Sequence, residues 1–111
     1  MNVISMLAAL EDKVSEAEGL LSILANRRRL IILYNLMMSG ELSVSDLVRR
    51  LDLAQSALSQ HLALMRVAGI VSTRREGTTV FYSLTDERTR ILLTTIKETF
   101  HPAIEAEVAR T

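Results

Sequence analysis

The feature that most restricts the fold is a pair of short predicted helices separated by only three residues. Ser43 followed three residues later by Asp46 is a capping-box-like start, which predicts a helix over 44–51. A tight turn at 52–54 leads into a second helix over 55–68. Apolar side chains recur at helical spacing along the buried side of this second helix, at Leu58, Leu62 and Met65. Two helices joined by such a turn form a helix-turn-helix.

A β-hairpin is predicted directly after this pair of helices. The stretches 70–75 and 78–84 are rich in β-branched and aromatic residues, and Glu76 and Gly77 supply a turn between them. A helix-turn-helix followed at once by a hairpin is a winged helix. The predicted fold class is therefore mainly α with a β-hairpin wing, a winged helix-turn-helix with about five helices.

Three further helices are predicted around this unit. Asn26 is a good N-cap for one, Asp86 opens the last one, and Gly19 is expected to bend or end the first. Pro102 lacks a backbone donor and is expected to interrupt the last helix. The predicted ranges are 3–18, 27–38 and 86–109.

Length and composition favour one helical domain spanning 1–111. Apolar residues make up 49% of the chain but aromatic residues only 4%, so the core must be built mainly from aliphatic side chains. The absence of cysteine excludes disulfides and thiol redox sensing. No membrane-length apolar run and no basic-then-apolar leader occur, so a cytoplasmic protein without membrane association is expected. No convergent set of acid, base and nucleophile is evident, which predicts that the chain is not an enzyme.

The net charge of zero conceals an uneven distribution along the chain. Residues 27–75 carry eight arginines against three acidic residues, a net charge of +5, whereas residues 1–26 carry −3 and residues 76–111 carry −2. Arginine forms bidentate contacts with phosphate oxygens and guanine edges more readily than lysine does. The central segment therefore favours a nucleic-acid partner, although ordinary solvated surface would explain the charges alone.

The face of helix 55–68 opposite its apolar side is predicted to read double-stranded DNA. A major groove admits a helix only when side chains near its N-terminus are short enough for close approach. The outward residues are small, polar or basic: Gln55, Ser56, Ser59, Gln60, Ala63 and Arg66. The glutamines suit base edges, the serines suit bases or phosphates, and Arg66 suits a backbone phosphate. His61 lies near the core boundary, where a packing or capping role is expected.

Additional DNA contacts are predicted from Arg28, in the first turn of the second helix, and from the wing residues Arg74, Arg75 and Thr78. The wing tip could reach a minor groove, where narrow A·T tracts concentrate negative potential. Two alternatives stay open. The wing arginines could merely keep an edge hairpin soluble, and the winged helix could be a protein-interaction module.

The segments LANRRRLIIL (24–33), QSALSQHL (55–62) and VSTRREGTTVFYSL (71–84) together resemble the ArsR/SmtB family of bacterial repressors. The resemblance covers nearly the whole chain, and it is strongest to the subgroup that contains HlyU, NolR and BigR. It implies a winged-helix regulator that binds an inverted-repeat operator as a homodimer. Repression is expected, and activation by anti-repression, in which another DNA-bound protein is displaced, is the alternative.

The resemblance also implies dimerisation through the first and last helices. A winged helix needs only about residues 26–84, so the amphipathic terminal helices, 3–18 and 86–109, have no obvious role within one DNA-binding unit. The predicted interface residues are Ile4, Leu7, Val14, Leu92, Ile96 and Phe100. The alternative is that the terminal helices only cover the core of the monomer.

The chain departs from its metal-sensing and sulfur-sensing relatives. Ser43 and Ser45 stand where metal sensors carry cysteines, and Arg88 replaces the first histidine of the zinc motif in the last helix. No metal and no cofactor are therefore expected. His101 and Glu105 are weak candidates, since two ligands per subunit fall short of what zinc requires. The sequence identifies no inducing ligand.

Overall fold

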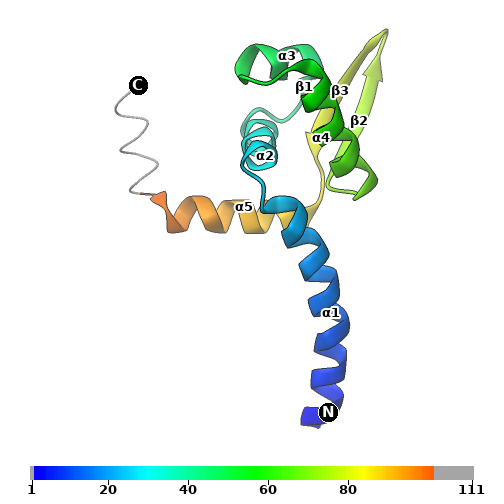
Figure 1. Cartoon of the computed structure of the whole chain (residues 1–111), viewed down its shortest axis with the longest axis vertical. Helices are drawn as coiled ribbons and strands as arrows, with labels where there is room; N and C mark the ends of the chain where they lie inside the picture. Colours follow the sequence, from blue (N-terminus) through cyan, green and yellow to red (C-terminus); the bar gives the residue numbers. More distant parts are fainter. Residues whose placement is uncertain (1, 102–111) are drawn as a thin grey trace.

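A computed structural model of the chain describes residues 2–101. The elements follow in the order α1, α2, β1, α3, α4, β2, β3 and α5, with a three-stranded antiparallel sheet among the helices (Figure 1). The mainly helical fold with a β-hairpin wing, predicted from the sequence, is confirmed. Residues 102–109 of the predicted last helix, together with the expected interruption at Pro102, lie outside the described residues.

Helix α1, Val3–Leu24, is longer than the sequence predicted. The predicted end at Glu18 is wrong, because the helix continues through Gly19 to Leu24. A glycine in a helix interior costs only about 1 kcal/mol. The last turn offsets this cost, since Leu24 is buried in the core and Leu20 and Ile23 pack against it.

Helix α2, Arg27–Ser39, begins after the predicted N-cap Asn26 and ends one residue later than predicted. The Asn26 side chain accepts a hydrogen bond from the Arg29 backbone N–H at 3.1 Å, as an N-cap should. Gly40 follows the helix with φ of 86°, a left-handed conformation that glycine adopts without steric cost.

The helix-turn-helix consists of α3, Val44–Arg50, and α4, Gln55–Val67. Its predicted capping box is confirmed. The Ser43 hydroxyl accepts from the Asp46 backbone N–H at 3.1 Å, and the Asp46 carboxylate accepts from the Ser43 backbone N–H at 3.0 Å. The bond from the Ser43 N–H holds the pKa of Asp46 below its usual value. Ser43 is therefore a structural residue at the start of the helix-turn-helix.

The sheet has a strand that the sequence analysis missed. The wing is formed by β2, Val71–Glu76, and β3, Thr79–Leu84, but β1, Leu42–Ser43, pairs with the other side of β3. The strand order is therefore β1-β3-β2. A strand of two residues carries no period-two pattern, so only its long-range pairing with Phe81 and Tyr82 reveals it.

Helix α5, Glu87–Thr99, begins at the predicted N-cap Asp86, whose carboxylate accepts from the Thr89 backbone N–H at 3.1 Å. Leu93 is fully buried, and its backbone carbonyl accepts a hydrogen bond from the Tyr34 hydroxyl at 2.8 Å. These contacts attach α5 to α2. The predicted interface residues of this segment, Leu92, Ile96 and Phe100, are half-buried or exposed.

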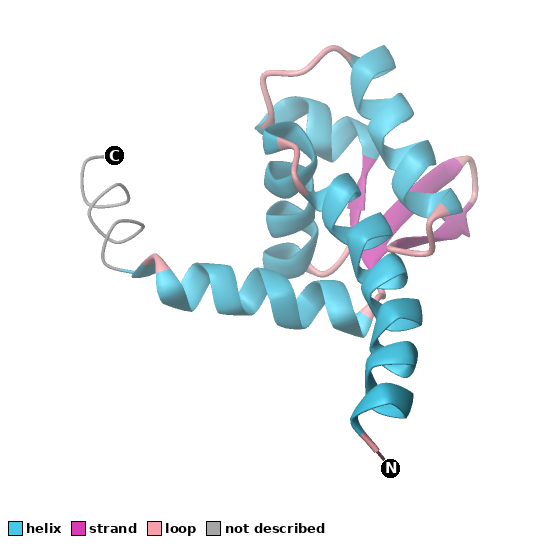
Figure 2. Cartoon of the chain, turned by 60° about the horizontal axis from the view of Figure 1, so that its bottom comes forward, coloured by secondary structure: helices cyan, strands magenta, loops and turns pink. Residues whose placement is uncertain are grey.

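The core is aliphatic, as the composition predicts. Its fully buried large side chains come from every helix except α1 and from the start of the wing: Ile32, Leu33, Leu36, Leu47, Leu58, Leu62, Met65, Ile70 and Leu93. Most of α1 and much of α5 lie outside this core (Figure 2). The helix-turn-helix and the wing lie at the opposite end of the molecule from the start of α1 (Figure 1).

Candidate nucleic-acid interface

Helix α4 presents two faces of opposite character. Leu58, Leu62 and Met65 are completely buried, which confirms the apolar side predicted from their spacing. The predicted DNA-reading residues are all exposed on the remaining surface of the helix: Gln55, Ser56, Ser59, Gln60, Ala63 and Arg66. Their spacing places them on one side of α4. The structure therefore brings these six together, and their contacts with DNA stay a prediction.

The start of α4 suits close approach to a phosphate backbone. Ala54 has extended backbone geometry and its side chain cannot accept a hydrogen bond, so it caps none of the first backbone N–H donors of the helix. No acidic residue occupies the first turn, and Arg66 stands in the last. An anion near the N-terminus would therefore meet donors and the positive end of the helix dipole.

His61, on the flank of α4, connects three helices through an arginine. The Arg29 Nε donates to His61 Nδ1 at 3.2 Å, and the same guanidinium donates to the backbone carbonyl of Ile23, in α1, at 3.3 Å. Burial, assisted by the charges of Arg29 and Arg28, lowers the pKa of His61. The imidazole is thus a neutral hydrogen-bond acceptor that fixes α4 against α2. The sequence predicted a packing or capping role but not this contact.

The predicted DNA-contacting residues of the wing are exposed, and one of its two arginines, Arg75, forms no ion pair within residues 2–101. Gly77, at the turn, has φ of 63°, which permits the tight reversal between β2 and β3. Arg75 and Thr78 are exposed at this end of the hairpin. Their predicted DNA contacts are consistent with that position and remain predictions.

Arg74 has a different environment from the other wing residues. Its guanidinium pairs with Glu41 at 3.0 Å and with Glu76 at 3.0 Å, and lies 4.9 Å from the centre of the Phe81 ring. The hydrogen bonds to Glu41, followed by that to Glu76, raise the pKa of Arg74 above its already high value. Arg74 is therefore charged but engaged by two carboxylates.

Arg28 lies apart from the wing, at the start of α2. It is exposed and lines a surface hollow of about 360 Å³ with Arg27, Ile31 and residues 51–53 of the turn before α4. The structure therefore places Arg28 close to the turn of the helix-turn-helix. A phosphate passing the start of α4 would lie near this second positive region, which is the basis for keeping Arg28 as a predicted backbone contact.

A second surface is apolar rather than polar. The predicted interface residues of α1 are highly exposed, with Ile4 at 79%, Leu7 at 52% and Val14 at 59%, and Phe100 beyond α5 is exposed at 59%. Large apolar side chains rarely gather on the surface of a monomer without a binding role. Further exposed apolar residues on the same two helices are Val3, Met6, Leu10, Leu21, Ile91 and Ile96.

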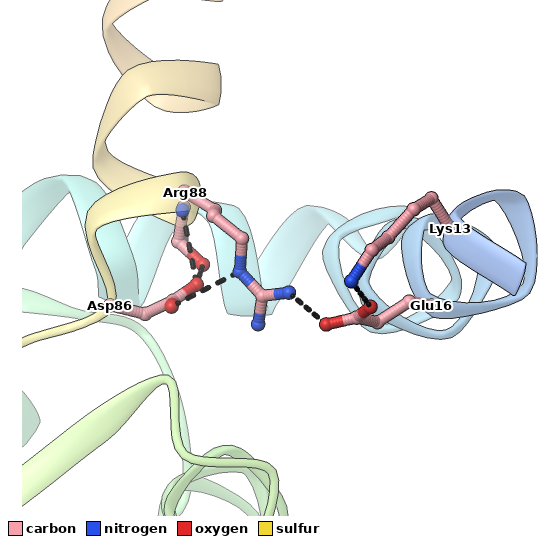
Figure 3. Close-up of polar contacts among 5 residues, drawn as sticks. Lys13, Glu16, Asp86 and Arg88 are labelled. Carbon is pink, nitrogen blue, oxygen red and sulfur yellow. Dashed lines mark hydrogen bonds and ion pairs between the residues drawn. The ribbon is translucent and has the colours of Figure 1, made fainter. Parts of the chain in front are cut away.

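Ion pairs hold α1 against the start of α5. Arg88 reaches Glu16 at 2.9 Å and the N-cap residue Asp86 at 3.5 Å, and Lys13 reaches the same Glu16 at 3.3 Å (Figure 3). The Lys13 ammonium, with a smaller contribution from Arg88, holds the pKa of Glu16 below its usual value. Arg88 thus connects α5 to α1.

No group of three or more potential metal ligands occurs among residues 2–101. His101 lies at the edge of this range, and Glu105, the other weak metal candidate, lies outside it. No helix within the same range combines the length and apolar character that a membrane span requires.

Comparisons with known proteins agree with this geometry. Residues 26–73 match the family "Bacterial regulatory protein, arsR family". The chain is 46% identical over 87 residues to the transcriptional activator HlyU of Vibrio cholerae, covering 78% of this chain and 80% of the relative. It is 41% identical over 87 residues to the biofilm growth-associated repressor of Agrobacterium fabrum, covering 78% and 74%.

The fold also agrees with the solved structure of a relative. The crystal structure of HlyU from Vibrio vulnificus superposes with a TM-score of 0.77 at 42% identity, covering 85% of this chain and 97% of that one. This structural match covers a larger share of the chain than the family match to residues 26–73 does. The chain belongs to the arsR family of bacterial regulatory proteins and is a winged-helix, DNA-binding regulator of transcription.

Proposed function

We propose that the chain is a homodimeric repressor that binds an inverted-repeat operator through α4 and the wing. The observation that carries this proposal is the outward face of α4, on which every exposed predicted contact is small, polar or basic. Gln55 and Gln60 contact base edges, Ser56 and Ser59 contact bases or phosphates, and Ala63 allows close approach. Arg66 contacts the phosphate backbone.

The remaining DNA contacts lie on either side of α4. Arg75 and Thr78 at the wing tip approach an adjacent groove, and Arg28 lies near a phosphate beside the start of α4. These contacts contribute mainly to affinity and to its salt dependence, since arginine side chains neutralise phosphates without reading sequence. Sequence preference comes from the shorter side chains on α4.

The second copy of the chain covers the apolar surface of α1 and α5. Ile4, Leu7 and Val14 face solvent from α1, and the Glu16–Arg88 ion pair fixes the position of α1 beside α5. A hollow of about 450 Å³ between these helices, lined largely by Ala17, Leu20, Ile91 and Leu92, offers further apolar surface. The predicted contributions of Leu92, Ile96 and Phe100 extend this interface along α5.

In this arrangement, two parts of the single domain have different functions. Residues 26–84 form the winged helix, while α1 and α5 serve as dimerisation elements. A symmetric dimer would place two copies of α4 in successive major grooves about 34 Å apart. Occupying an operator in this way represses transcription by blocking polymerase.

Selection of bound duplexes from a random double-stranded pool tests the proposal. The expected result is enrichment of an inverted repeat whose binding weakens steeply between two salt concentrations. Failure to enrich any sequence, with purified dimer present in excess, would contradict operator binding by the protein alone and favour a protein-interaction module.

Activation is the second candidate function because the relative from Vibrio cholerae is named a transcriptional activator. In that case the dimer would displace another DNA-bound protein rather than block polymerase. Transcription in vitro from a promoter that contains the selected sequence separates the two. Repression predicts less transcript when only polymerase and the regulator are present, whereas displacement predicts no decrease.

A further inference from the structure

Arg74 is the wing residue with the most contacts inside the protein. Its Nε lies 3.0 and 3.3 Å from the two carboxylate oxygens of Glu41, and its Nη2 lies 3.2 Å from one of them. Its Nη1 donates to Glu76 at 3.0 Å. All three guanidinium nitrogens are therefore engaged, and two of them hold the same carboxylate in a bidentate manner.

These contacts join the two outer strands of the sheet across the middle one. Arg74 in β2 and Ser43 in β1 both face Phe81 of β3 in the register of the sheet, and Glu41 directly precedes β1. The guanidinium lies over the Phe81 ring on its way from β2 to Glu41. The wing is thus tied to the segment that leads into α3.

We propose that Arg74 is a positioning residue, which holds the wing at a fixed place relative to the helix-turn-helix and leaves Arg75 and Thr78 to contact DNA. The inference rests on the proposed DNA surface, and it reassigns a residue that the sequence alone placed on that surface. Glu41 shares this positioning role because it supplies the carboxylate that pairs with Arg74. An acidic residue near a DNA-binding face would ordinarily only weaken DNA binding.

The surroundings of Arg74 are unfavourable for a phosphate. Two carboxylates beside one guanidinium leave a local excess of negative charge, which repels DNA. A direct contact would also require the bidentate pair with Glu41 to open. An isolated surface ion pair contributes little, but bidentate geometry, a second carboxylate and an aromatic ring act together here.

The direction in which Glu41→Ala changes DNA affinity distinguishes a positioning role of Arg74 from a direct contact with DNA. Simple electrostatics predicts unchanged or tighter binding when this carboxylate is removed, because the change makes the surface more positive and frees Arg74. The positioning role predicts that affinity for a duplex recovered from the random pool falls about three- to tenfold. Asp52→Ala is the matched charge control, since it removes an exposed carboxylate beside the predicted contact Arg28 that forms no ion pair within residues 2–101, so unchanged or tighter binding is expected.

A double substitution tests whether the contact itself matters. Glu41→Arg combined with Arg74→Glu keeps the total charge and restores an opposite pair, although it places a carboxylate beside Glu76, so it should recover part of the affinity lost in Glu41→Ala. Unchanged or tighter binding by Glu41→Ala would overturn the proposal, as would a drop of about 0.9 in the salt slope for Arg74→Ala, the value expected for a lost phosphate contact.

Hydrogen exchange of the free protein tests the inference without DNA. Backbone amides of residues 71–84 should exchange faster in Glu41→Ala than in the unmodified protein, while those of α4 stay unchanged. Equal exchange would overturn the positioning role even if the random pool yields an operator. Faster exchange with no selected duplex would leave the Glu41–Arg74 contact supported and contradict only the proposed function.

Discussion

Helices α4 and α1 both expose a long face, but the two faces differ in chemistry. Outward residues of α4 such as Gln55, Ser59 and Gln60 are polar and remain solvated in the free protein. Outward residues of α1 such as Ile4 and Leu7 are apolar, and leaving them in water costs free energy. A polar exposed face suits a transient partner such as DNA, whereas an apolar one calls for a permanent partner.

The largest effect is expected inside α4, where one helix combines a buried and an exposed face. Leu62→Ala removes a completely buried side chain and should lower the free energy of unfolding by about 2 to 5 kcal/mol. Leu64→Ala, at a position on the same helix that is 39% exposed, should cost less than about 1 kcal/mol. Urea denaturation of both variants checks this, and equal losses would show that the two faces are not distinct.

The next effect concerns the apolar face of α1. Leu7→Asp combined with Val14→Asp would bury two unpaired charges in the proposed interface, so the protein should become monomeric. Affinity for the selected inverted repeat should then fall at least about 100-fold, because the two half-sites are no longer bound together. Analytical ultracentrifugation and DNA titration measure the two consequences.

Ala9→Asp is the matched control for that pair. Ala9 is exposed on α1 but lies roughly opposite Leu7 around the helix, at two residues' separation. It should keep the dimer and the DNA affinity. If Ala9→Asp also dissociated the dimer, any added charge on α1 would disrupt the assembly. If the variant with both Leu7→Asp and Val14→Asp remained dimeric, the interface would lie elsewhere.

A smaller effect is expected on the polar face of α4. Gln60→Ala should weaken binding to the selected duplex by about 1 to 3 kcal/mol and leave binding to unrelated duplexes nearly unchanged, as expected for a base contact. Arg66→Ala provides the contrast, since it should weaken all duplexes similarly and flatten the salt dependence. If Gln60→Ala weakened every duplex equally, its assignment to a base edge would be wrong.

The smallest expected effect is a pH dependence of the free energy of unfolding that arises from the protonation of His61. Its pKa is lowered in the folded state, so the unfolded chain binds more protons as the pH falls below the usual histidine value of 6.5. The free energy of unfolding should therefore decrease as the pH falls from about 7 towards 5. His61→Asn retains an acceptor for Arg29 but does not titrate, so the decrease should be smaller. Identical pH profiles would exclude His61 as the cause.

Local signals were sufficient to predict the helix-turn-helix and the starts of the helices around it. The caps at Asn26, Ser43 and Asp86 depend on residues only a few positions away, and the structure confirms each of them. The buried face of α4 followed from spacing alone. In the same way, the exposure of its opposite face could be predicted before any tertiary contact was known.

The features that the sequence analysis missed depend on distant residues. Strand β1 exists because it pairs with Phe81 and Tyr82. Arg74 pairs with Glu41, which lies 33 positions earlier in the sequence. Helix α1 continues past Gly19 for a related reason, since the packing of the following turn against the core outweighs the low helix propensity of glycine.

The spacing of half-sites tests most directly whether two copies of α4 read one operator. Five base pairs inserted between the halves of the selected inverted repeat would rotate them onto opposite sides of the duplex, and ten would restore their alignment. The dimeric arrangement predicts that the first insertion reduces affinity to that of a single half-site, and that the second recovers part of it. Equal affinity for all three duplexes would contradict the dimer as the DNA-reading unit.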